Sequence, residues 1–107
     1  MVTIVTEIQV KPGSEPQWDE LMRERMSTAR KHYGWVGGQL LQPEGDPHRR
    51  VIVGTWKTRD DWKEWHNDSQ FQDTRSELDQ LVSGPEECMW HDVVIEIRHE
   101  AGRDRAM

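Results

Sequence analysis

Apolar and polar residues alternate along the first ten positions of the chain. One parity of this segment holds Val2, Ile4, Thr6, Ile8 and Val10. A period of two is typical of a strand with one buried face. The proline and glycine of residues 11–13 favour a turn, so we expect the strand to end there.

The spacing then changes to a helical one. Apolar positions recur every three or four residues at Trp18, Leu21, Met22, Met26 and Ala29. We expect a helix that Ser14 caps, that runs to about His32, and that Gly34 ends in a left-handed cap.

Two extended segments follow, at residues 35–42 and 50–57, with a short polar link between them. Such a pair is typical of a β-hairpin. Gly37 and Gly38 predict a bulge or a close approach of another group in its first strand.

A second helix is predicted to begin at Thr58, because Thr58 and Asp61 have the spacing of a capping box. Its polar stretch 66–70 predicts a break, with Ser69 as the cap of a continuation that ends before Gly84. A last strand is expected over residues 89–98, and residues 99–107 look like a flexible tail.

Strand, helix, hairpin, helix and strand together give an α+β domain of the ferredoxin-like β-α-β-β-α-β type, spanning residues 1–98. Two helices can cover only one face of the sheet. The strands nevertheless carry apolar residues on both parities, for example Val5 beside Ile4 and Val53 beside Ile52. A sheet with one face in water would alternate, so we expect a homodimer.

Composition narrows the possible partners. The net charge is −6 with dispersed basic residues, which disfavours nucleic acid as a partner. Neither an apolar stretch of membrane-spanning length nor a signal sequence is present, so no membrane partner is expected. The single Cys88 fits a reducing, cytoplasmic location. Six Trp in 107 residues exceed what so small a core would hide, so some are expected at a pocket or interface.

Four sequence pieces carry a family resemblance: residues 34–37 (GWVG), residues 55–58 (TWKT), Trp62, and residues 65–71 (WHNDSQF). With these pieces the chain resembles the antibiotic biosynthesis monooxygenase family over about residues 2–98. The resemblance implies a dimeric α+β barrel whose subunits each hold a cavity between sheet and helices.

Two branches of that family imply different residues. In the haem-degrading branch, the Asn, Trp and iron-binding His positions fall on Thr6, Trp65 and Thr74, so only the Trp is matched. This argues against haem degradation unless His66 has taken over the role of iron ligand. In the quinone-forming branch, which uses no metal or organic cofactor, the Trp, Tyr and Asn positions fall on Trp56, Trp62 and Ile52. Here too only the Trp is kept.

The candidate catalytic residues are therefore Trp56, Trp65 and His91. His91 joins them because a half-buried histidine can act as a base near neutral pH. The candidate substrate-binding residues are Thr6, Ile52, Trp62, Phe71 and Thr74. Each could instead be a packing or surface residue. His66, about 100° around the helix from Trp65, is expected to face solvent, and no metal site is indicated because no histidine pair has ligand spacing.

The leading functional hypothesis is a monooxygenase that needs no cofactor and oxidises an aromatic or polycyclic phenol with O₂. A deprotonated phenol is electron-rich enough to react with O₂ itself, so the protein would bind, desolvate and stabilise the anion. The alternatives are a haem-binding or haem-degrading enzyme and a dimeric small-molecule-binding protein without catalysis.

Overall fold

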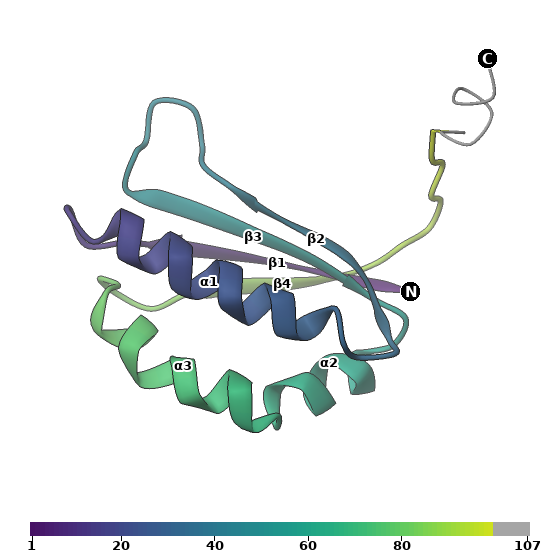
Figure 1. Cartoon of the computed structure of the whole chain (residues 1–107). Helices are drawn as coiled ribbons and strands as arrows, with labels where there is room; N and C mark the ends of the chain where they lie inside the picture. The colour runs from purple at the N-terminus through teal and green to yellow at the C-terminus, as the bar shows by residue number, and fades with distance from the viewer. Residues whose placement is uncertain (100–107) are drawn as a thin grey trace, which may run out of the picture.

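A computed structural model describes residues 1–99 of the chain. Their four strands form one antiparallel sheet, and their helices lie on one side of it (Figure 1). In chain order the elements are β1 (Val2–Gln9), α1 (Glu15–Ala29), β2 (Trp35–Leu41), β3 (Arg49–Trp56), α2 (Arg59–His66), α3 (Ser69–Gln80) and β4 (Glu87–Asp92). The ferredoxin-like α+β fold is thus confirmed.

The strands lie in the order β2-β3-β1-β4. On β1, Ile4, Thr6 and Ile8 are buried toward the helices, as their alternation predicted. The register places Thr6 opposite Ile52 on β3 and opposite Cys88 on β4. These three side chains therefore share the helix-covered face of the sheet.

The buried core has two parts. One part gathers Ile8, Val10, Trp18, Met22 and Leu78. The other gathers Ala29, Trp56, Trp65 and Phe71. The side chains that line the cavity described below come from both parts, so the two halves of the core meet around a hollow.

The second helical region is interrupted, as its polar stretch predicted. The Thr58–Asp61 capping box that starts α2 is present, with the Asp61 backbone N–H donating to Thr58 Oγ1 at 3.2 Å. The cap of α3 is Asp68 and not Ser69, because the Asp68 carboxylate accepts a hydrogen bond from the Gln70 N–H at 2.8 Å. An aspartate at this position satisfies a free N–H of the first turn.

The end of α1 differs from its prediction. The helix stops at Ala29, and Gly34 does not have a positive φ. Gly34 is needed for a different reason: a Cβ there would overlap the side chain of Asp61. Ser14 occupies the N-cap position without a side-chain hydrogen bond. The predicted bulge is present, as a register shift between Trp35 and Gly37.

The last strand is shorter than predicted. It ends at Asp92, opposite Val2, and the Val93 N–H then donates to the carbonyl of Met1 at 3.1 Å. Among the described residues β4 pairs with β1 alone, and no strand pairing is present beyond this hydrogen bond. Residues 93–99 therefore leave the sheet (Figure 1), with Val94 and Ile97 each 90% exposed.

The tail predicted over 99–107 lies, except for its first residue, outside the residues that the structure describes. Within residues 1–99, no helix has both the length and the apolar character needed to cross a membrane.

Candidate active site

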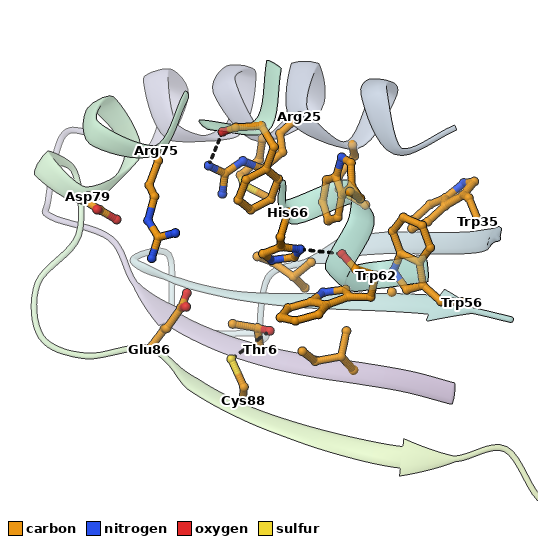
Figure 2. A pocket seen from close by; sticks show the side chains of 17 residues that line it. Thr6, Arg25, Trp35, Trp56, Trp62, His66, Arg75, Asp79, Glu86 and Cys88 are labelled. Atoms are coloured by element: carbon orange, nitrogen blue, oxygen red, sulfur yellow. Dashed lines mark hydrogen bonds between the residues drawn. The ribbon is translucent and has the colours of Figure 1, made fainter. Parts of the chain in front are cut away.

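A cavity of about 140 Å³ lies between the sheet and the helices. Figure 2 shows aromatic side chains on one side of it, including Trp56 and Trp62, and charged side chains on the other, including Arg75 and Glu86. A second hollow, of about 360 Å³, adjoins it and shares Met22, Arg25 and Ile52 in its wall. A ligand larger than the first cavity could therefore extend into the second.

The strands form the floor of the cavity. Thr6 and Ile52, both predicted to bind substrate, line it together with Cys88. The Thr6 hydroxyl lies 3.5 Å from the Cys88 sulfur and is thus held against the floor. Ile52 occupies the position at which the resemblance to the quinone-forming branch implies an Asn. The floor therefore offers an apolar side chain there in place of an amide.

Trp56 and Trp65 form the inner aromatic wall. They are 1% and 7% exposed, and their ring centroids are 5.4 Å apart. The Trp65 indole N–H donates to Thr28 Oγ1 at 3.0 Å, so it has a protein partner and is not free for a ligand. Both line the cavity, and their burial makes them part of the core as well.

The rings of Trp62, His66 and Phe71 pack against one another at the cavity in tilted arrangements. The His66 ring lies 3.6 Å from the Trp62 ring and 4.1 Å from the Phe71 ring, centroid to centroid. The expectation that His66 faces solvent is wrong. It lies four residues after Trp62, so the two share a helix face, and Phe71 at the start of α3 packs against that face.

The hydrogen bond of His66 fixes its tautomer. Nδ1 lies 2.9 Å from the backbone carbonyl of Trp62 (Figure 2). A carbonyl can only accept, so Nδ1 carries the proton and Nε2 keeps its lone pair. Within residues 1–99, Nε2 has no hydrogen-bond partner.

The surroundings of His66 keep it neutral. Burial is the main cause that lowers the pKa of His66, to about 4, and the positive charges of Arg25 and Arg75 lower it further. The imidazole is therefore neutral at pH 7 and can accept a proton at Nε2. An anion formed beside it would favour the imidazolium and so assist that transfer.

Arg25 holds a fixed position in the wall. Its Nε donates to Thr74 Oγ1 at 2.9 Å and its Nη2 to the Phe71 carbonyl at 3.2 Å. Its Cζ lies 3.7 Å from the centroid of the Phe71 ring. Burial lowers the pKa of Arg25 to about 10, so it stays charged at pH 7. Thr74, predicted to bind substrate, does not line the cavity and instead orients Arg25.

His91 is not brought to the cavity. It pairs with Thr3 of β1, on the sheet face away from the helices, and it is exposed. Its neighbour Trp90 points the other way, with its ring centroid 4.9 Å from that of Trp62 in an edge contact. His91 shares the open face of the sheet with Met89, two residues before it.

Sequence reasoning thus missed His66 and Arg25. The spacing of each residue from buried neighbours on its own helix could have indicated that it faces the cavity. His66 is four residues after Trp62, and Arg25 lies three residues after Met22 and four before Ala29, both buried. Long charged residues on a buried stripe are easily read as solvent-facing, because their stems can cover apolar surface while the charge reaches water.

The position of the family's iron-binding His offers no usual haem ligand in this chain. His66, which lines the cavity and bonds only through Nδ1, is the histidine of residues 1–99 that could take that role. The hydroxyl of Thr74, at the position of the family's iron-binding His, accepts from Arg25 and donates to the Phe71 carbonyl. Threonine is also not among the usual haem ligands.

Lowering the pH from 7 to 5 is expected to destabilise the wild type more than a His66→Gln variant. In this range the unfolded histidine, with a pKa of 6.5, takes up a proton, whereas the folded one stays neutral. Stability therefore rises with pH between about 4 and 6.5. The difference between the two proteins should be on the order of 1 kcal/mol after a discount for partial exposure. Urea unfolding at both pH values measures it, and equal losses would contradict a neutral folded His66.

A family comparison bears on this geometry. Residues 1–77 match the family model described as antibiotic biosynthesis monooxygenase. The match contains β1 to α2 and most of α3, and therefore His66 and Arg25. No protein of curated function matches the chain in sequence.

Solved structures share the fold at low sequence identity. A proposed antibiotic biosynthesis monooxygenase from Nitrosomonas europaea superposes with a TM-score of 0.83 at 19% identity, covering 89% of this chain and 100% of that one. SnoaB, a cofactor-independent oxygenase from Streptomyces nogalater, gives 0.79 at 16% identity, covering 92% and 97%. A conserved protein from Methanosarcina mazei gives 0.79 at 17% identity, covering 84% and 89%. At these identities the likeness shows the fold alone.

Proposed function

Because the chain belongs to the antibiotic biosynthesis monooxygenase family, we propose that it is a monooxygenase that oxidises an aromatic phenol with O₂ and needs no cofactor. The observation that carries this proposal is the neutral His66, whose free Nε2 lies in a cavity walled by aromatic rings. A reaction of this kind needs a base and a dry aromatic site. The similar fold of SnoaB, a cofactor-independent oxygenase, agrees with it.

Each wall of the cavity has a part in this proposal. Trp62, His66 and Phe71 give the cavity an aromatic wall against which the substrate ring packs, while Thr6 and Ile52 form the floor beneath it. Trp56 and Trp65 close the inner end and exclude water. His66 takes the place that sequence reasoning gave to His91.

The reaction balances without a further reductant. His66 Nε2 takes the phenolic proton, and the phenolate carbon para to the oxygen reacts with O₂. Loss of water then leaves a second carbonyl group, so that 1-naphthol and O₂ give 1,4-naphthoquinone and one water. The substrate loses four electrons and O₂ gains them. One oxygen atom enters the product and the other leaves in water, with the His66 proton.

Oxygen uptake tests the function. Purified protein is mixed with 1-naphthol and with 1,8-dihydroxyanthrone, and O₂ consumption is followed together with the mass of the product. We expect consumption that depends on the protein and a product with one more oxygen and two fewer hydrogens. If the protein neither consumes O₂ with these phenols nor binds them, the proposal is overturned. Titration with haemin tests the haem alternative, which a Soret shift that saturates at one haemin per chain would favour. Binding of the phenols without O₂ uptake would favour a small-molecule-binding protein without catalysis.

We also propose that the chain works as a homodimer. The sheet face without helices carries the cross-strand pair Val5 and Val53, and Met89 is 64% exposed beside them. The apolar segment beyond β4 is exposed as well, with Ile95 at 77%. A second copy could cover both surfaces about a two-fold axis.

Light scattering behind a sizing column is expected to give about twice the 12.7 kDa of one chain. Met89→Glu should shift the protein to a monomer, because the charge would enter the interface while the exposed side chain leaves the single chain undisturbed. A wild type that stays monomeric would contradict the dimer.

A cytoplasmic location is also part of the proposal. Cys88 is a free, exposed thiol at the cavity. Thiols of this kind persist in reducing compartments, whereas secreted small domains more often pair their cysteines.

A further inference from the structure

Arg25 forms no direct ion pair within the described part of the chain, and Asp79 and Glu86 attract its charge only at longer range. None of its nitrogens forms an ion pair with a carboxylate of residues 1–99. By contrast Arg50, which is buried, is held by Asp19. Its Nε donates to Oδ1 at 2.8 Å and its Nη2 to Oδ2 at 3.1 Å. An arginine in a cavity wall with no carboxylate bonded to it can take an anionic ligand as its partner.

The guanidinium is also pre-oriented. Thr74 and the Phe71 carbonyl bind Nε and Nη2, and neither of these partners neutralises the charge. Nη1 has no hydrogen bond to the described residues, and Arg25 lines both the aromatic cavity and the adjoining hollow. The free N–H groups are therefore available at the junction of the two spaces.

Arg25 and His66 are close enough to act on one small molecule. The Arg25 Cζ and the His66 ring lie 3.7 and 4.1 Å from the centroid of the same Phe71 ring. The sum of these two distances is an upper bound on the separation of the two groups, so one fused aromatic ring system could carry a phenolic hydroxyl to His66 and an acidic group to Arg25.

We propose that Arg25 binds a carboxylate of the substrate, so that the substrate class is a hydroxylated aromatic acid. This inference rests on the proposed function, because it adds a specificity residue to the same cavity. The other charged side chains at the cavity favour a single position for an anion, next to Arg25. Arg75 adds positive charge from α3, while the exposed Asp79 and Glu86 stand at the charged side of the cavity (Figure 2) and would keep an anion away from that rim.

A matched ligand pair tests the carboxylate site. Under anaerobic conditions at pH 7, calorimetry compares 1-hydroxy-2-naphthoate with 1-hydroxy-2-naphthamide, which has the same shape but no charge. We expect the wild type to bind the acid about ten- to a hundredfold more tightly, the range of one charge-assisted hydrogen-bonded pair. Arg25→Met should abolish this preference and Arg25→Lys should keep part of it, because lysine retains the charge without the planar fork.

Arg30→Met is the control, since Arg30 is an exposed arginine of the same region and does not line the aromatic cavity. It should keep the full preference. Equal binding of acid and amide by the wild type, or a preference unchanged in both Arg25 variants, would overturn the inference. Thermal unfolding shows whether Arg25→Met is folded. If it is not, the preference for the acid is measured with Arg25→Lys and Arg25→Gln instead.

The two proposals fail in different ways. If the protein prefers the acid but consumes no O₂, the Arg25 site is supported and the oxygenase proposal is contradicted. If it consumes O₂ but binds acid and amide equally well, the oxygenase is supported and the Arg25 site is contradicted.

Discussion

His66→Gln is expected to lower kcat for phenol oxidation by about 10²- to 10⁴-fold, the usual contribution of a positioned general base. Glutamine has a similar size and can still donate to the Trp62 carbonyl, as Nδ1 does at 2.9 Å. It has no lone pair that accepts a proton at neutral pH. O₂ consumption at saturating 1-naphthol measures the loss, and binding of 1-hydroxy-2-naphthoate shows that the cavity is intact.

His48→Gln is the matched control. His48 lies in the turn before β3, where its Nδ1 pairs with Glu15, and it does not line the cavity. It should retain wild-type kcat. An unchanged kcat in His66→Gln would contradict the base assignment, and a loss confined to His91→Gln would move the base to the open face of the sheet.

Trp65→Ala is expected to lower the free energy of unfolding by about 3–5 kcal/mol, as truncation of a buried aromatic does. The side chain is 7% exposed and contacts Trp56 and Phe71. Its loss would also leave Thr28 Oγ1 without the indole N–H. Urea unfolding measures the change.

Two variants frame that result. Trp65→Phe keeps most of the ring but loses the hydrogen bond, and should cost about 0.5–1.5 kcal/mol. Trp62→Ala removes a half-buried ring that stacks on His66, so it should lower ligand affinity with a smaller effect on stability. A Trp65→Ala protein as stable as the wild type would show that Trp65 serves the ligand alone.

Elements with strong local patterns were predictable from the sequence. The alternation of β1 and the stripe of α1 each depend on the period of one segment. The capping box at Thr58 and Asp61 is likewise a contact within four residues. These features also fix the order of elements, from which the fold follows.

Features set by distant partners were not predictable in this way. The last strand was predicted to continue to residue 98, but in the described part of the chain β4 pairs with β1 alone and ends at Asp92, opposite Val2. His66 and Arg25 both depend on how α3 packs, since Phe71 contacts each of them. A helical wheel drawn for one helix cannot show where a second helix will place such a ring.

The fate of molecular oxygen tests the central claim most directly. Chelator-treated protein is given oxygen-18 gas and 1-hydroxy-2-naphthoate, and the product is analysed by mass spectrometry. We predict one labelled oxygen atom in each quinone formed by the wild type, the other in water, and little product with His66→Gln. Absence of labelled product from the wild type, with this acid and with 1-naphthol, would contradict the assignment of this cavity as an oxygenase site.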